Sequence, residues 1–177
     1  MKIESRYTLS FPRRMVWDTL LDPETLGRCL PGCEKFEEVA RDKYAVTVKL
    51  GVSAVTGTYN GTVEIADKTP PDSYKLRGEG KGPPGWARGE AVFRLSEADG
   101  KTEVVTTADV AVGGTIAGVG QRMLEGVSKV MVQQFFEAVE KELSGQKVRF
   151  TFLGAILGWF RIAFRMLLEA LRGWRRG

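Results

Sequence analysis

The sequence predicts an α+β domain in which a curved antiparallel sheet wraps around one long C-terminal helix, with an amphipathic tail helix after it. Two observations favour this fold class. Segments of alternating polar and apolar residues recur between residues 34 and 112, and one long stretch with helical spacing follows them. A chain of 177 residues has room for one core and a short appendage. We therefore expect a domain over residues 1–145 and a tail over residues 146–177.

The N-terminal part is expected to form one strand and two short helices. Residues 3–10 alternate in polarity, which is typical of a strand. After Pro12, apolar residues are spaced four apart, as on a helix. Asp22-Pro23-Glu24 then combines an N-cap residue, a proline at the first helical position and an acid in the first turn. Leu30-Pro31-Gly32 ends this second helix.

Residues 34–112 are predicted to form about six strands. Turn signals separate the alternating segments at Arg41-Asp42, Pro70-Pro71-Asp72, Pro83-Pro84-Gly85 and Asp99-Gly100. Because the segments are close together with no helices between them, they should pair in an antiparallel sheet.

A long helix is expected from about Ala117 to Leu143. Its predicted inner stripe is apolar apart from one glutamine: Met123, Val127, Val130, Met131, Gln134, Phe135 and Val139. A long helix packed on a curved antiparallel sheet is a helix-grip arrangement.

Small residues dominate the inner face of the predicted sheet, at Gly57, Gly61, Gly78, Gly80, Gly82, Ala87, Gly89, Ala91 and Ala108. Such a run indicates curvature or free space. If the long helix closes over this face, a ligand cavity results, which we expect to be lined by Tyr44, Tyr59, Phe93, Met123, Val127, Met131 and Phe135. The alternative is a strongly bent sheet whose interior is filled by side chains of the helix.

The tail carries the basic charge of the chain. From Lys147 onward there are seven basic residues and one acid, whereas the whole chain has a net charge of only +4. Residues 150–160 are uncharged but too few to cross a bilayer. On a helix, the later charges form a narrow stripe opposite a broad apolar face, which predicts an interfacial membrane helix. Its predicted membrane-binding residues are Phe152, Trp159, Phe160, Arg161, Phe164, Arg165, Arg172, Trp174 and Arg176.

Two other roles remain open for this tail: docking into a groove of a partner protein or of a second copy, and a tilted spanning helix. A basic, aromatic-rich end favours an anionic membrane or an acidic partner over nucleic acid. The N-terminus has no continuous apolar stretch, so we expect no secretory signal and a cytoplasmic location.

Few residues offer catalytic or metal-binding chemistry. The chain has no histidine, which excludes Ser-His and Cys-His nucleophiles. Cys29 and Cys33 cannot complete a tetrahedral metal site by themselves, so we expect no metal and two inert thiols, with a disulfide or redox role as the alternative. The glycine-rich segment 113–120 lacks the Lys-Ser or Lys-Thr of a phosphate loop and is interpreted as a turn.

Several motifs resemble the family of the carbon monoxide dehydrogenase G subunit. They occur in the family's order and comprise Cys29-Leu30-Pro31-Gly32-Cys33, Val48-Lys49-Leu50-Gly51, Gly57-x-Tyr59-x-Gly61-x-Val63, Gly78-x-Gly80-x-Gly82, Trp86-Ala87-Arg88-Gly89, Asp109-Val110-Ala111-Val112-Gly113-Gly114, Gly118-Val119-Gly120-Gln121-Arg122 and Gln134-Phe135-Phe136. The resemblance covers about residues 1–145. It implies membership of the START-like, or polyketide cyclase-like, helix-grip superfamily.

The resemblance also implies a function. Members of this family are non-catalytic accessory proteins of molybdenum-containing carbon monoxide dehydrogenases and related hydroxylases, held on the inner face of the cytoplasmic membrane by a C-terminal extension. The implied ligand is lipophilic: menaquinone or a similar isoprenoid quinone, carried in the cavity to the enzyme. We expect Trp86, within the family motif, to contribute to ligand binding as well. The alternatives are an assembly or recruitment factor with no ligand role, and a small cyclase-type enzyme.

Overall fold

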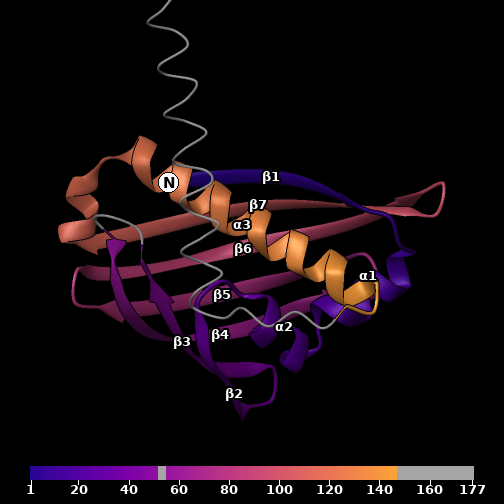
Figure 1. The fold of residues 1–177 in the computed structure, drawn as a ribbon, viewed down its shortest axis with the longest axis horizontal. Helices are drawn as coiled ribbons and strands as arrows, with labels where there is room; N and C mark the ends of the chain where they lie inside the picture. Colours follow the sequence, from indigo (N-terminus) through magenta and orange to yellow (C-terminus); the bar gives the residue numbers. More distant parts are fainter. Residues whose placement is uncertain (52–54, 147–177) are drawn as a thin grey trace, which may run out of the picture.

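The computed structural model describes residues 1–51 and 55–146, and the fold is drawn in Figure 1. The tail residues predicted to bind a membrane lie outside the described residues. The elements are β1 (Lys2–Leu9), α1 (Arg13–Leu20), α2 (Pro23–Cys29), β2 (Cys33–Ala40), β3 (Lys43–Leu50), β4 (Gly57–Thr69), β5 (Ser73–Gly82), β6 (Gly85–Ala98), β7 (Lys101–Gly114), a 3₁₀ helix η2 (Thr115–Val119) and α3 (Gln121–Leu143). This order confirms the predicted succession of strand, two helices, six strands and a long helix.

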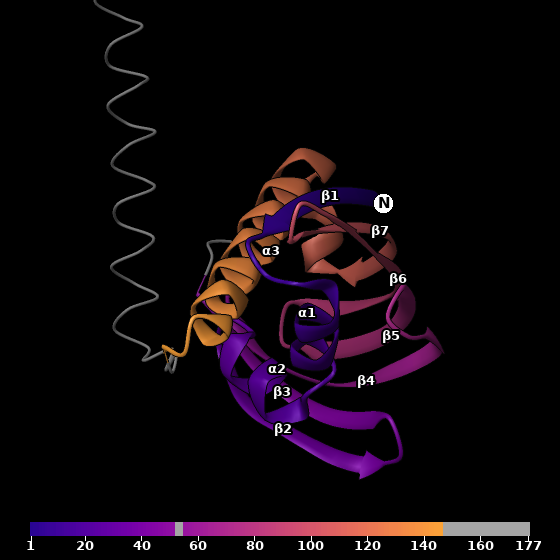
Figure 2. The ribbon, with the colours of Figure 1, turned by 90° about the vertical axis from the view of Figure 1, so that its right-hand side faces the viewer.

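All seven strands form one sheet with the order β1-β7-β6-β5-β4-β3-β2, and every neighbouring pair is antiparallel. The chain therefore meanders from β2 to β7, and β1 adds to the far edge beside β7. The sheet curves around one side of the molecule, and α3 runs across its concave face (Figures 1 and 2). The predicted helix-grip fold class is confirmed.

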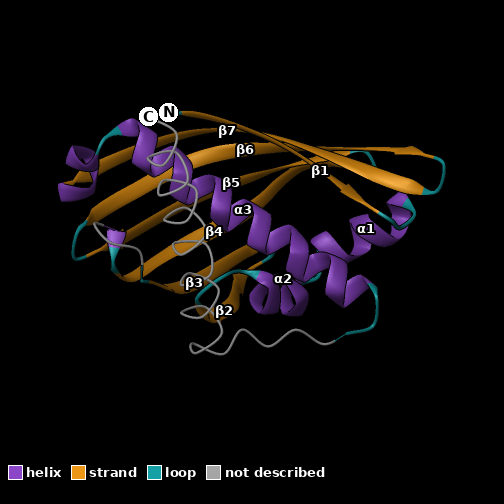
Figure 3. Cartoon of the chain, turned by 45° about the horizontal axis from the view of Figure 1, so that its top comes forward, coloured by secondary structure: helices purple, strands orange, loops and turns teal. Residues whose placement is uncertain are grey.

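The two short helices between β1 and β2 close one end of the concave face (Figure 3). Asp22 caps α2, since its Oδ2 accepts a hydrogen bond of 2.9 Å from the backbone N–H of Thr25. α1 buries Val16, Trp17 and Leu20. The Trp17 ring meets the ring of Tyr74 from β5 edge-on, with centroids 5.6 Å apart. α1 thus fills this end of the sheet with large side chains.

α3 starts later than the sequence suggested. The predicted helix from Ala117 is instead a 3₁₀ turn, η2, followed by α3 from Gln121. The separation occurs at Gly120, whose φ of +94° cannot continue a right-handed helix. The structure also corrects the predicted inner stripe. The helix residues buried most deeply are Phe136, Ala138, Val139 and Leu143, of which only Val139 belonged to that stripe.

The C-terminal half of α3 is packed firmly on the sheet. Phe136 is almost fully buried, and its ring stacks on that of Tyr7 from β1 with centroids 5.0 Å apart. Arg28 of α2 holds the end of α3 through Glu142, with Nε to Oε1 at 3.0 Å and Nη2 to Oε2 at 3.2 Å. These contacts fix the helix over one end of the concave face.

Candidate ligand pocket

On the concave face, the inward side chains of β5 and β6 become smaller with distance from α1. The strand register identifies the rows of neighbouring residues in which this occurs. Tyr74 of β5 pairs with Phe93 of β6, which pairs with Thr106 of β7. The next inward-facing row is Leu76, Ala91 and Ala108, and the following two are Gly78, Gly89 and Val110, then Gly80, Ala87 and Val112. Aromatic rings fill the end of the sheet beside α1, whereas glycine and alanine leave the middle of β5 and β6 nearly bare.

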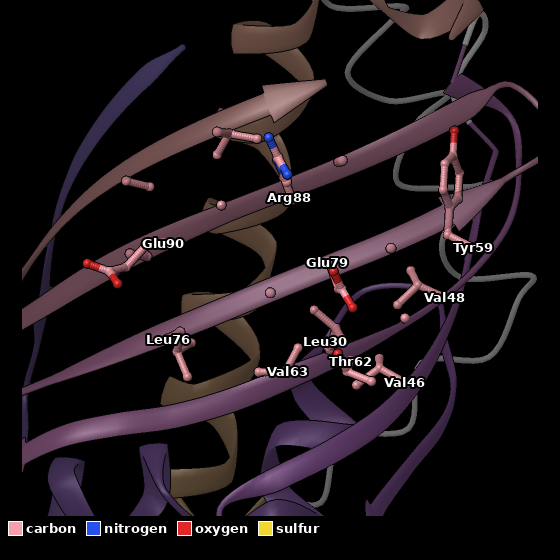
Figure 4. A pocket seen from close by; sticks show the side chains of 18 of the residues that line it. Leu30, Val46, Val48, Tyr59, Thr62, Val63, Leu76, Glu79, Arg88 and Glu90 are labelled. Carbon is pink, nitrogen blue, oxygen red and sulfur yellow. The ribbon is translucent and has the colours of Figure 1, made fainter. Parts of the chain in front are cut away.

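A pocket of about 380 Å³ lies over these small residues. Figure 4 shows the pocket, with Leu76 and Glu79 of strand β5 labelled. This strand has no side chain at two successive inward positions, Gly78 and Gly80. Its apolar lining residues are Leu30, Val46, Val48, Tyr59, Val63, Leu76, Ala87, Ala91, Ala108 and Val110. A pocket of this size and lining falls within the range of small-molecule binding sites.

The charged residues that border the pocket are not directed into it. Glu79, Arg88 and Glu90 also line it, but they alternate with the inward-facing glycines and alanines of β5 and β6. Glu90 is engaged on the outer face, where its Oε2 accepts a 2.9 Å hydrogen bond from Nε of Arg77. This pairing holds the pKa of the Glu90 carboxyl below its ordinary value. The pocket is therefore suited to an apolar occupant.

α3 is supported on either side of this pocket by two separate apolar clusters. Phe136 and Val139 belong to the main core, against which Val132 and Phe135 also pack. Near the start of the helix, Leu124 and Val127 pack against a second, small cluster formed by Val55 and Ile116. Between these two supports, Ser128 and Met131 are only partly buried.

Tyr59 closes the pocket on the side of the second cluster. Its hydroxyl donates a hydrogen bond of 3.0 Å to the backbone carbonyl of Val55. Its ring lies against β5, since a Cβ on Gly82 would come within 2.9 Å of it. Burial raises the pKa of the Tyr59 phenol, so this group stays protonated at neutral pH. Tyr59 is the one predicted ligand-binding residue that lines this pocket, among the residues that the structure describes.

The other predicted ligand-binding residues surround the pocket or lie away from it. Tyr44 and Phe93 are buried in the core, where they stack on Phe36 and Tyr74. Met123, Val127, Met131 and Phe135 lie along α3, which contributes none of the described lining residues. Their roles in ligand binding remain predictions.

Trp86 is on the opposite side of the sheet from the pocket, and its role in ligand binding also remains a prediction. It is 39% exposed, and Arg88 lies over its ring at 5.5 Å from the centroid. A Cβ on Gly113 would come within 2.3 Å of that ring. The alternation along β6 could have revealed this, since Ala87 and Gly89 face inward and Trp86 must therefore face outward. The same alternation along β3 points Val46 and Val48 into the pocket, although neither was among the expected lining residues.

The glycines of the concave face serve two different purposes. A Cβ on Gly61 would lie 1.9 Å from the carbonyl oxygen of Glu79, and one on Gly89 would lie 2.5 Å from that of Asp109. These two positions need glycine because a neighbouring strand approaches closely. A Cβ on Gly78 or Gly80 would have no neighbour nearer than 3.8 Å. The backbone does not require glycine there, and its effect is to leave the pocket open.

The two cysteines are both free. Cys29 is fully buried, and desolvation raises the pKa of its thiol to about 12, with Glu142 adding to the shift. Burial likewise raises the pKa of Cys33, whose Sγ lies 3.3 Å from the carbonyl oxygen of Lys35. Neither thiol is a ready thiolate at neutral pH, as the prediction of inert cysteines requires. Within residues 1–51 and 55–146 no group of His, Cys, Asp and Glu side chains is arranged to hold a metal ion.

A curved seven-stranded antiparallel sheet around a long C-terminal helix, with an apolar pocket on its concave face, defines a protein of the START-like helix-grip class. The chain belongs to the family of the carbon monoxide dehydrogenase G subunit (CoxG), which it matches over residues 7–144. This confirms the resemblance seen in the sequence motifs. A comparison with curated protein sequences gives no match.

Solved structures share the fold of this chain. A conserved protein from Geobacillus kaustophilus is 36% identical, with a TM-score of 0.80 over 82% of this chain and 96% of that protein. An aromatase/cyclase from Streptomyces sp. R1128 is 21% identical, with a TM-score of 0.60 over 81% of this chain and 93% of the cyclase. A protein from Thermus thermophilus is 17% identical, with a TM-score of 0.62 over 82% and 98% of the two chains. The last two show a shared fold.

Alanine substitutions at the two kinds of glycine should have different effects on the free energy of unfolding. We expect Gly61→Ala to destabilise the domain by about 1–3 kcal/mol, because its methyl group collides with the backbone of β5. Gly78→Ala and Gly80→Ala should leave the free energy of unfolding unchanged or raise it by about 0.4–1 kcal/mol. Urea unfolding of the three variants measures the difference. Equal destabilisation by all three would contradict the distinction.

Proposed function

We propose that this protein is a non-catalytic, membrane-associated accessory protein that carries a lipophilic small molecule in the concave pocket. The proposed ligand is an isoprenoid quinone such as menaquinone. The proposed client is a molybdenum hydroxylase of the carbon monoxide dehydrogenase type, at the inner face of the cytoplasmic membrane. The observation that carries the ligand role is the open space above Gly78 and Gly80, where the backbone would accept side chains that the sequence does not supply.

The lining favours a lipophilic ligand for a physical reason. Each buried methylene group gains about 0.8 kcal/mol on leaving water, and the isoprenoid chain of a quinone supplies many such groups. Transfer from a bilayer to an apolar pocket, in contrast, is nearly neutral because both surroundings are apolar. The exchange of such a molecule between a membrane and a pocket of this kind therefore involves little net free-energy change in either direction.

A binding role, not a catalytic one, agrees with the polar groups near the pocket. The Tyr59 hydroxyl is already engaged with the carbonyl of Val55, and the pKa of its phenol is raised. The carboxylate of Glu90 is paired with Arg77 on the outer face of the sheet. Similarity to the aromatase/cyclase concerns the fold, and none of these groups is free in the pocket for acid–base work. The family assignment supports the association with a carbon monoxide dehydrogenase.

Association with the membrane is assigned to the tail. None of the described helices is long and apolar enough to cross a bilayer. Seven basic residues and several aromatic ones follow Gln146 in the sequence. Basic charge combined with an apolar face is the composition of helices that lie in the membrane interface. The tail would then keep the pocket close to the source of its ligand.

Filling the pocket should abolish the carrier role without unfolding the protein. We expect Gly78→Val combined with Gly80→Val to weaken binding of a short-chain menaquinone by about tenfold or more, because the added side chains occupy the space over β5. Isothermal titration in detergent measures the affinity. Gly126→Val is the matched control, since Gly126 is exposed on α3 with open space around it. Unchanged binding in the double variant, with folding intact, would leave recruitment of the enzyme as the function.

The tail should bind anionic vesicles through its arginines. Replacing Arg161, Arg165, Arg172 and Arg176 by glutamate should weaken sedimentation with phosphatidylglycerol vesicles and reduce its dependence on salt, since each basic residue near an anionic surface contributes about 1 kcal/mol. The control replaces Arg41, Lys43, Arg94 and Lys101, which are exposed on the folded domain. A membrane-binding tail would be contradicted if only the control variant lost vesicle binding, or if the parent chain did not bind vesicles at all. Either result would favour docking of the tail into a groove of a partner protein or of a second copy.

A further inference from the structure

One end of the folded domain has no charged residues on two of its connecting segments. No Asp, Glu, Lys or Arg occurs between Gly82 and Ala87, at the turn from β5 to β6, or between Val110 and Gln121, where β7 passes through η2 to α3. At the opposite end, the turns and the strand ends beside them contain Asp42, Lys68, Asp72 and Asp99. The uncharged segments and these charged turns therefore lie at opposite ends of the long axis of the domain, along which β5, β6 and β7 run (Figures 1 and 3).

The two uncharged segments form one surface. The backbone N–H of Ile116 and the hydroxyl of Thr115 both donate hydrogen bonds to the carbonyl of Pro84, at 3.0 and 2.6 Å. Gly85 also pairs with Gly114 at the end of the sheet. We call this surface the tip. It is defined by its exposed residues Pro83, Trp86, Ala117, Gly118, Gly120 and Met123.

The tip combines exposed apolar side chains with a basic rim. Trp86 is 39% exposed and Met123 is 36% exposed. Four charged residues flank the uncharged segments. Lys81, Arg88 and Arg122 are exposed basic residues, for which no ion pair is found within residues 1–51 and 55–146. The fourth, Asp109, is neutralised by the N-terminal ammonium group, which lies 3.6 Å from its Oδ1. Tryptophan favours the membrane–water interface, and unpaired basic residues are attracted to anionic headgroups.

The tip is also adjacent to the pocket. Ile116 packs with Val55, Leu124 and Val127 in the small cluster under α3. Val55 in turn accepts the hydrogen bond from Tyr59, which lines the pocket. A few aliphatic side chains and one tyrosine therefore separate the pocket from the tip. Among residues 1–51 and 55–146, no charged residue is fully buried.

We propose that the tip docks on an anionic lipid bilayer and is the route by which a lipophilic ligand passes between the bilayer and the pocket. The docking is independent of the proposed ligand, whereas the route rests on the proposed function. Charge complementarity favours the bilayer as the partner of this surface: the centre of the tip is uncharged and its rim is basic.

The tail can reach the same membrane as the tip. α3 has 23 residues and leads away from the tip, so the described chain ends about 35 Å from it at 1.5 Å per residue. About ten extended residues cover that distance, and more than that follow Gln146. The tip alone offers few apolar side chains, and stable membrane attachment generally takes two signals. The tail would supply one and the tip the other.

Trp86 provides a direct probe of docking. In the full chain with Trp159→Phe and Trp174→Phe, only Trp86 and the buried Trp17 remain. Vesicles of phosphatidylcholine and phosphatidylglycerol with brominated acyl chains should quench the Trp86 emission, and vesicles without bromine should not. Adding Trp86→Phe should remove the quenched component. A chain that sediments with the vesicles but shows no quenching would overturn tip docking while leaving tail binding in place.

The route is tested separately by ligand transfer. Ala117→Asp should slow the uptake of menaquinone from vesicles by about tenfold or more, because a charge at the tip opposes contact with the bilayer. Binding of menaquinone presented in detergent should be unchanged. Ala98→Asp is the matched control, since Ala98 is an exposed alanine at the end of β6, at the other end of the domain. Equal uptake by the Ala117→Asp variant and the parent chain would overturn the route, whereas failure of the parent to bind menaquinone in detergent would overturn the proposed function.

Discussion

The way α3 is supported on the sheet determines most features of this molecule. Its C-terminal half is held by Phe136 and Val139 in the main core, and its start is held by Leu124 and Val127 on the cluster of Val55 and Ile116. In between, the sheet presents Gly78, Gly80 and Gly89 where a filled core would present leucine or valine. A close-packed interior normally leaves few voids larger than a water molecule. Here the two supports keep the helix in place over a region that the sheet does not fill.

This arrangement separates stability from ligand binding within one domain. The aromatic rows at the α1 end, with Trp17, Tyr74 and Phe93 in contact, supply the tightly packed core. The glycine rows supply space at little cost to the backbone, because β5 keeps its pairing with β4 and β6 at Gly78 and Gly80. The sheet can therefore tolerate a pocket in its middle, since its hydrogen bonds and the core beside α1 hold it together. The pocket lies in a domain that has an uncharged tip at one end and charged turns at the other.

Most of the fold could be predicted from the sequence, because local signals determine it. Alternation identified the strands, and Asp22-Pro23 marked the start of α2, where the cap is observed. The start of α3 was placed too early, because the left-handed conformation at Gly120 depends on how η2 folds back onto Pro84. Phe136 was missing from the predicted stripe, because the face that α3 buries depends on where Tyr7 and α1 lie in the folded domain.

The pocket was predicted only in part. The run of small residues correctly indicated space on the concave face, but side-chain volume alone does not tell which glycines the backbone requires. That distinction, between Gly61 and Gly80 for example, depends on how closely neighbouring strands approach. Residues of the helix were expected to line the pocket, whereas strand residues such as Val46 and Leu76 do so. The helix contributes mainly through its supports at either end.

The central claim is that the concave pocket carries one lipophilic molecule, and native mass spectrometry tests it most directly. The full chain would be purified in mild detergent from its own cells and sprayed with bound lipids retained. We expect a species heavier than the chain by the mass of one isoprenoid quinone, which is absent when Gly78 and Gly80 are both replaced by valine. A parent chain that carries no adduct, or adducts that persist equally in the filled variant, would contradict this claim.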